Sequence, residues 1–169
     1  IIDASWHMPG ENRNARAEYL EEHIPGAIFF DIDEIADTKS NLPHMLPSPE
    51  KFSSRMRSMG IGDGSRIVVY DSVGLFSAAR VWWTFRVMGV EDVTVLNGGL
   101  PKWKREDLPL ESGEPRLRST RHFTSRRNAD FVRDVLGKPE AGVVPCALVF
   151  RPRIAESDDE FDGRFGEGH

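Results

Sequence analysis

The sequence predicts an α/β protein with a small parallel sheet and helices on both faces. Short β-branched runs alternate with helical patterns along the chain, and the two clearest runs, at residues 66–70 and 92–96, are separated by one helical segment. A strand, a helix and a strand in that order require a parallel pair with a right-handed crossover. The length of 169 residues fits one domain of ordinary size.

The first half of the chain follows this plan. An apolar pair runs into Asp3 and Ser5, which is typical of a strand end followed by a loop, and we expect the natural polypeptide to extend upstream. The other elements are a helix at residues 15–23, a turn at 24–26, a strand at 27–31 and an amphipathic helix at 49–59 that begins with a proline. Residues 33–47 show no period and contain two prolines, so we expect a long surface loop of the kind that often carries function.

The second half begins with the clearest strand, at residues 66–70 (RIVVY), which follows a glycine-rich turn. Apolar side chains recur at helical spacing after residue 76 until Gly89, a residue well suited to end a helix. The remaining predictions are a strand at 92–96, a short helix opening at 100–104, a polar connector at 106–124, a strand at 143–150 interrupted by a proline, and an acidic solvated tail at 156–162.

Composition excludes several classes of function. Lys and Arg number 22 against 27 Asp and Glu, so the net charge of −5 offers no basic field for nucleic acid. The longest apolar runs are far shorter than the roughly 20 residues that span a bilayer, so we expect no membrane association. Cys146 is the single cysteine, which excludes an internal disulfide and cysteine-pair zinc sites and favours a reducing, cytoplasmic compartment. No His, Asp or Glu spacing resembles a metal site, and we expect neither a metal nor a cofactor.

Ligands of open parallel sheets bind beyond the carboxyl ends of the strands, which directs attention to residues 71–76. This loop leads directly into a helix, so its backbone N–H groups are expected to form a small anion cradle. The loop has Asp71, Ser72 and Gly74 but no cysteine, and the first two are poor nucleophiles without a neighbouring base. We therefore assign no catalytic residue to it, and helix capping by Asp71, Ser72 or Ser77 is the simpler interpretation. Apolar neighbours indicate that Cys146 is a buried, inert thiol.

Six segments of the chain are informative when taken together: DASWHMPG at 3–10, HIPGAIFFDID at 23–33, PHMLPSPEKF at 43–52, VVYD at 68–71, GLFSAARVWWTFRVMG at 74–89 and VLNGGLPKW at 95–103. They resemble the N-terminal domain of two-domain sulfurtransferases, the rhodanese and 3-mercaptopyruvate sulfurtransferase family. The resemblance covers about residues 1–140 and implies a rhodanese-like fold. We divide the chain into a non-catalytic rhodanese-like domain at 1–124 and a linker with a divergent C-terminal tail at 125–169.

In this family the reactive cysteine lies in the second domain, in a loop placed like residues 71–76 here, and it accepts sulfur as a persulfide. The resemblance implies that the first domain lines the substrate cleft, with Asp33 and His44 as its contributions. Taken alone, these two residues would be a turn cap and a surface histidine. A GRF segment at 163–165 makes Arg164 a further candidate for binding the anionic substrate. The sudden loss of resemblance after residue 140 suggests a truncated or frame-shifted coding region.

Two functions of different class follow. The first is one half of a sulfurtransferase that is inactive alone. With a second rhodanese domain present, it would bind a small sulfur-containing anion such as mercaptopyruvate or thiosulfate. We expect the surface that faces the second domain to be an apolar flank. The second is a non-catalytic rhodanese-like interaction module. A related phosphatase is disfavoured because its chemistry needs a thiolate and an arginine at fixed spacing, whereas Arg80 lies eight positions after Ser72 and not six.

Overall fold

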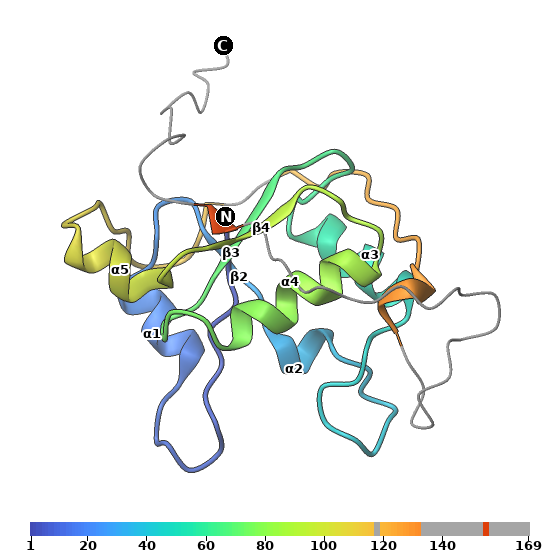
Figure 1. Ribbon diagram of the computed structural model, residues 1–169, viewed down its shortest axis with the longest axis horizontal. Helices are drawn as coiled ribbons and strands as arrows, with labels where there is room; N and C mark the ends of the chain where they lie inside the picture. The colour runs from blue at the N-terminus through green and yellow to red at the C-terminus, as the bar shows by residue number, and fades with distance from the viewer. Residues whose placement is uncertain (117–118, 133–153, 156–169) are drawn as a thin grey trace.

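The structure is a computed structural model that describes residues 1–116, 119–132 and 154–155. Its sheet contains β1 (Ile2–Asp3), β2 (Ile28–Phe29), β3 (Ile67–Tyr70), β4 (Val93–Leu96) and β5 (Ile154–Ala155). The order across the sheet is β2-β1-β3-β4-β5, and every neighbouring pair is parallel (Figure 1). This confirms the predicted parallel sheet. The strand expected at residues 143–150, the acidic tail, Cys146 and Arg164 lie outside the described residues.

The helices are α1 (Ala15–Glu21), α2 (Ile32–Ile35), α3 (Pro49–Ser58), α4 (Ser77–Val87) and α5 (Gly99–Arg105). Side-chain caps explain where the first three begin: Asn14 accepts from the N–H of Ala17, and Ser48 from that of Lys51. The predicted loop at residues 33–47 is wrong at its start, because Asp31 caps the short helix α2 by accepting from the N–H of Glu34. In the described part of the chain, no helix combines the length and apolar character needed to cross a membrane.

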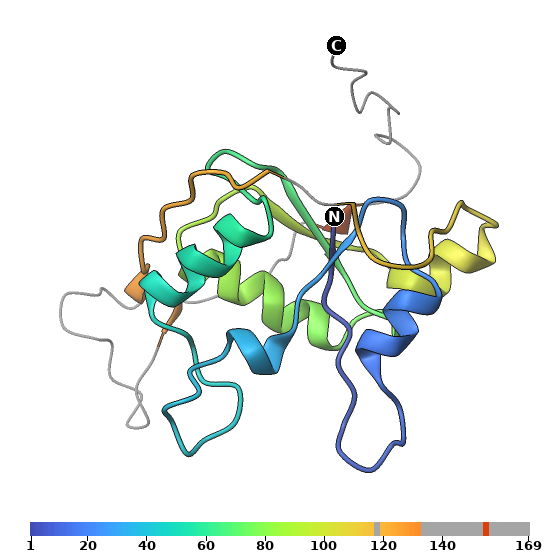
Figure 2. The same ribbon diagram turned by 180° about the vertical axis from the view of Figure 1, so that it is seen from behind.

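Helices cover both faces of the sheet, as predicted (Figures 1 and 2). Adjacent strand residues point to opposite faces, so Val69 and Tyr70 enter two different cores. Val69 belongs to the larger core, which contains apolar residues of α2, α3 and α4 such as Ile35, Phe52 and Phe85. Tyr70 belongs to the smaller core, which contains Tyr19 of α1 and Leu100 of α5.

Residues 122–132, here called the strap, lie against α3 and α4. Phe123 is 4% exposed, and its ring centroid lies 5.8 Å from that of Phe52. Further along, the N–H of Arg126 donates to the carbonyl of Met88 at 3.0 Å, and the indole of Trp83 donates to the carbonyl of Phe131 at 3.0 Å. The segment predicted as a polar connector thus ends in an apolar anchor.

Candidate functional site

The carboxyl ends of β1, β2 and β3 meet at one edge of the sheet, and the residues singled out from the sequence lie beyond that edge. Asp33 is on α2, which follows β2, and His44 is in the loop between α2 and α3. Asp71, Ser72 and Gly74 are in the loop after β3. The parallel arrangement therefore gathers segments that are distant in sequence.

Asp33 and His44 are brought together, with Trp6 from the segment after β1 as a third member. The Nδ1 atom of His44 lies 3.0 Å from the Oδ1 atom of Asp33. The indole Nε1–H of Trp6 donates to the Oδ2 atom of Asp33 at 3.0 Å. The rings of Trp6 and His44 meet edge to face, with centroids 4.9 Å apart and planes at 84°.

The imidazole of His44 is partly sheltered while the carboxylate of Asp33 is open to solvent. The side chain of His44 is 31% exposed and that of Asp33 is 64% exposed. The Nδ1 atom of His44 is itself shielded from solvent and has no aligned hydrogen-bond partner among the described residues, although the Asp33 oxygen is close.

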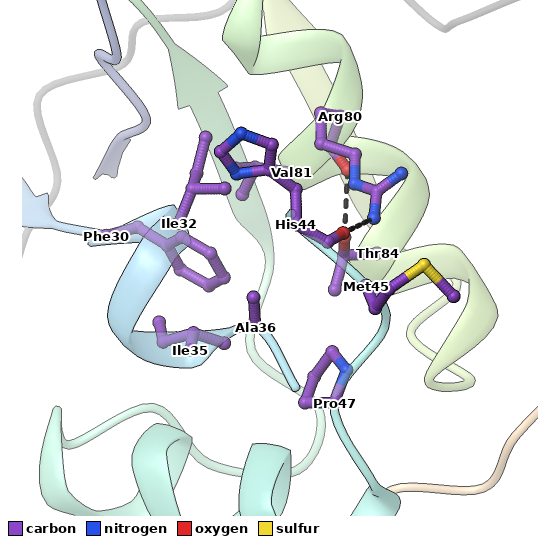
Figure 3. Close-up of a pocket in the computed structure, with 10 residues that line it drawn as sticks. All are labelled: Phe30, Ile32, Ile35, Ala36, His44, Met45, Pro47, Arg80, Val81 and Thr84. Atoms are coloured by element: carbon purple, nitrogen blue, oxygen red, sulfur yellow. Dashed lines mark hydrogen bonds between the residues drawn. The ribbon is translucent and has the colours of Figure 1, made fainter. Parts of the chain in front are cut away.

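The backbone of His44 is held in an unusual conformation by Arg80 of α4. His44 has a φ of +54°, a region that costs a residue with a side chain about 1 kcal/mol or more. The guanidinium of Arg80 donates to the carbonyl oxygen of His44 (Figure 3). Arg80 is half-buried against the ring of Trp83, 4.6 Å from its centroid, and burial lowers the pKa of Arg80. A guanidinium nevertheless remains charged, so this donor is present throughout the accessible pH range.

The loop at residues 71–76 is organised around the side chain of Asp71, which is fully buried. Its Oδ1 atom accepts from the N–H groups of Val73 at 3.0 Å and Gly74 at 2.7 Å. Its Oδ2 atom accepts from the N–H groups of Phe76 at 2.7 Å and Ala78 at 2.9 Å, which caps α4. Three of the N–H groups that the sequence suggested as an anion cradle are therefore occupied by a carboxylate of the chain itself.

The same loop is tied to neighbouring segments through backbone groups. The carbonyl oxygen of Asp71 accepts from the N–H of Leu100 at 3.0 Å. A Cβ atom at Gly99 would lie 2.6 Å from that oxygen, and Gly99 has a φ of +53°, so this position requires glycine. The N–H of Ser72 donates to the Oγ atom of Ser5 at 2.9 Å.

A second buried carboxyl group lies under the loop, at Asp3. Its Oδ1 atom accepts from the N–H of Ser5 at 2.8 Å, and the residue is 1% exposed. Burial raises the pKa of Asp3, and the nearby charge of Asp71 adds to this effect. Burial likewise raises the pKa of the Tyr70 hydroxyl, which accepts from the N–H of Ile24 at 3.2 Å.

The capping role that the sequence left open among three residues belongs to Asp71. The hydroxyl groups of Ser72 and Ser77 are buried and have no hydrogen-bond partner among the described residues. Gly74 has a φ of +121°, which accounts for a glycine at that point of the loop. Among residues 1–116, 119–132 and 154–155, no group of three or more His, Cys, Asp or Glu side chains could hold a metal ion.

Trp6 is the member of the site that sequence reasoning did not single out. It lies within the DASWHMPG segment, but its hydrogen-bond partner is 27 positions away. Its ring also lies 6.4 Å from that of Phe76, so Trp6 is between His44 and the loop after β3. Only the three-dimensional arrangement reveals this position.

Comparison with known proteins gives consistent results. Residues 11–106 match the rhodanese-like domain. The chain is 55% identical over 112 residues to thiosulfate/3-mercaptopyruvate sulfurtransferase 2 of Arabidopsis thaliana, which corresponds to 66% of this chain and 33% of that protein. It is 52% identical over 118 residues to 3-mercaptopyruvate sulfurtransferase of Escherichia coli, corresponding to 69% of this chain and 42% of that protein.

Solved structures agree with these matches. The crystal structure of the E. coli 3-mercaptopyruvate sulfotransferase SseA superposes with a TM-score of 0.76 at 46% identity, over 80% of this chain and 52% of that one. Tum1 of Saccharomyces cerevisiae superposes with a TM-score of 0.68 at 35% identity, over 75% of this chain and 42% of that one. This chain thus spans about a third to two fifths of the two curated relatives described above.

Proposed function

The chain belongs to the rhodanese-like domain family, and we propose that it provides the non-catalytic, N-terminal half of a sulfurtransferase that acts on 3-mercaptopyruvate or thiosulfate. Relatives at about half identity carry these activities in their names. In this proposal residues 1–124 form the rhodanese-like domain, residues 125–169 are linker and divergent tail, and the chain does not transfer sulfur alone.

The observation that carries the proposal is that backbone N–H groups of the loop after β3 already bind the carboxylate of Asp71. Sulfur transfer of this kind needs a thiolate, because a polarisable sulfur nucleophile both attacks and leaves readily. Here three N–H groups of the loop, those of Val73, Gly74 and Phe76, donate to the carboxylate of Asp71, together with the N–H of Ala78 in α4. Because these donors are already bound and residues 71–76 contain no cysteine, the proposal places the reactive thiol in a second domain.

Five apolar side chains on the same edge support the presence of such a second domain. Each is between 43% and 57% exposed, and we call them together the apolar edge: Met8, Met45, Val73, Leu75 and Phe76. Exposed apolar groups that gather beside a site are typical of docking surfaces. A domain that covers this edge would enclose Asp33 and His44 in the cleft between the two.

The role of His44 in that cleft follows from the chemistry of the donor. A thiolate of the second domain attacks the sulfur of 3-mercaptopyruvate, the S–S bond of a persulfide forms, and the C–S bond breaks. The electron pair of the C–S bond stays on carbon, which becomes the enolate of pyruvate and takes up one proton. We assign the transfer of that proton to His44, oriented by Asp33: its Nε2 atom takes the proton released from the sulfur of the donor and gives it to the carbon.

Mass spectrometry of the chain tests whether it acts alone. After incubation with 3-mercaptopyruvate or thiosulfate, we expect the intact mass to show no added sulfur atom, and a thiocyanate assay to show no turnover. A persulfide on Cys146, with turnover that is lost in Cys146→Ser, would show that the chain is itself a catalyst and that the proposal is wrong.

A fusion tests whether the chain serves as half of an enzyme. The C-terminal domain of the E. coli relative, which supplies a reactive cysteine, is joined after the strap. We expect 3-mercaptopyruvate turnover by the fusion, and a loss in His44→Asn of about a hundredfold, the usual size of a general acid–base contribution. Asparagine is chosen because it tolerates positive φ. A folded fusion without turnover would favour the non-catalytic interaction module instead.

A further inference from the structure

We propose that Trp6 is a positioning residue: its indole N–H fixes the carboxylate of Asp33, and the fixed carboxylate holds the proton of His44 on Nδ1. This inference deepens the proposed function, because a histidine with its proton on Nδ1 presents an unprotonated Nε2 atom to a reacting group. Trp6 itself is not assigned any contact with substrate.

The contacts of Trp6 support a role beyond packing. Its ring does pack against the main core, but its Nε1–H is directed to the Oδ2 atom of Asp33 at 3.0 Å. The other oxygen of the same carboxylate, Oδ1, is the one that lies 3.0 Å from Nδ1 of His44. Each oxygen of Asp33 therefore faces one ring nitrogen, and Trp6 and His44 also touch each other edge to face.

Physical chemistry explains why Asp33 needs such a partner. Its side chain is 64% exposed, and exposed pairs of charged groups contribute little when both side chains are free to move. A hydrogen bond from a ring that is already packed in the core restricts the carboxylate at small additional entropic cost. Nearby Arg55 does not provide this restraint, because it pairs with Glu34 at 2.6 Å.

The arrangement also explains the position of the buried Nδ1 atom of His44. This atom is shielded from solvent and has no aligned hydrogen-bond partner among the described residues. A buried polar atom without a partner is costly, and Asp33 is the acceptor within reach. The tautomer of a histidine is set by the bond that one of its nitrogens makes, so the carboxylate determines which nitrogen remains free.

Nitrogen-15 NMR of the histidine side chains tests this inference on the chain itself. The signals of His44 are identified by their absence in His44→Asn. We expect the neutral ring of His44 to carry its proton on Nδ1 in the unmodified chain, and to shift toward the Nε2–H tautomer in Trp6→Phe. Phenylalanine retains an aromatic ring but lacks the N–H donor.

Two further variants make the result specific. Trp103→Phe is the matched control, because the indole of Trp103, on α5, donates to the carbonyl of Pro109 at 2.8 Å and not to the site. We expect this variant to leave the tautomer of His44 unchanged. Asp33→Asn should change the tautomer as Trp6→Phe does, without any alteration of Trp6. An Nδ1–H tautomer that persists in Trp6→Phe would overturn the inference, and so would one that persists in Asp33→Asn.

Kinetics of the fusion provide an independent second readout. Groups that orient metal-binding histidines contribute about 10- to 100-fold, and by analogy we expect Trp6→Phe to lower kcat about tenfold while KM stays within about twofold. The same change should have little further effect in a His44→Asn background. Because the NMR experiment needs no sulfur transfer, an inactive fusion with the expected tautomer shift would refute the proposed function and leave the role of Trp6 intact.

Discussion

Asp71 and Asp3 are buried carboxyl groups at the ends of neighbouring strands, and they differ in the number of backbone N–H groups that donate to them. Asp71 accepts from four backbone N–H groups. Asp3 accepts from the backbone N–H of Ser5, and hydrogen bonds from the Ser5 and Tyr70 side chains also favour its charged form, but burial has the larger effect and raises its pKa. Removal of charge should therefore have opposite consequences at the two positions.

At Asp71, we expect Asp71→Ala to lower the free energy of unfolding by about 3 kcal/mol, because several buried N–H groups would lose their acceptor. Asp71→Asn should also be costly, since its NH₂ group would face two of those donors. Urea denaturation measures both. Asp92→Ala, at an exposed residue paired with Arg66 at 3.4 Å, is the control and should change stability by less than about 1 kcal/mol. If Asp71→Ala and Asp92→Ala lower the free energy of unfolding equally, Asp71 does not have the central role assigned to it.

At Asp3, the prediction concerns pH. A folded-state pKa above the unfolded value means that the charged form penalises folding at neutral pH, and that the penalty disappears as the pH falls. We expect the free energy of unfolding of Asp3→Asn, relative to that of the unmodified chain, to be highest at pH 7. This advantage should decline as the pH falls from the raised folded-state pKa of Asp3 to its ordinary value of 3.8. Urea unfolding at several pH values from 7 to 4 measures this; a stability difference that does not change with pH would contradict it.

Among the secondary-structure elements, those with a strong local pattern were predicted correctly. β3, β4, α3 and α4 agree with the sequence because β-branched runs and helical spacing are local properties. α2 was missed because four residues are too few to show a helical period. The anchor at Phe123 was missed for a related reason, since a single aromatic residue in a polar segment has no periodicity.

The candidate site shows the same limit. The resemblance, and not the local pattern, directed attention to Asp33 and His44. The hydrogen bond from Trp6 to Asp33 spans 27 positions, and no spacing rule of helices or strands relates residues so far apart. The sequence likewise did not predict that Asp71 would bind the N–H groups of its own loop. A carboxylate before a helix indicates a cap, but it does not indicate how many donors that carboxylate will bind.

For the strap, we expect Phe123→Ala to lower the free energy of unfolding by about 3 kcal/mol, as is usual for a buried aromatic residue. Phe123 is 4% exposed and touches Phe52, so its removal leaves a cavity between the strap and α3. Leu110→Ala is a suitable control because Leu110 is 38% exposed. If both variants unfold at the same urea concentration, the strap does not contribute to the stability of the domain.

At the scale of the whole molecule, the apolar edge leaves a surface suited to a partner. We expect the chain to self-associate with increasing concentration, because the apolar edge of one copy can pack against that of a second copy. Sedimentation velocity over a hundredfold range of concentration measures this. Leu75→Glu should shift the distribution toward monomer, whereas Leu110→Glu, outside the apolar edge, should not. Monomeric behaviour of the unmodified chain at the highest concentration would count against the prediction.

β1 lies between β2 and β3 in the sheet, yet it precedes both of them in the sequence. Ile2 pairs with Val69, so at synthesis rates of about 5 to 20 residues per second its partner leaves the ribosome about 3 to 13 s later. During that interval β1 lacks one of its two neighbouring strands, and the carboxyl group of Asp3 is still in water. The pairing of β1 with β3 therefore waits for the synthesis of β3, and slower codons between residues 3 and 69 would prolong the exposure of β1.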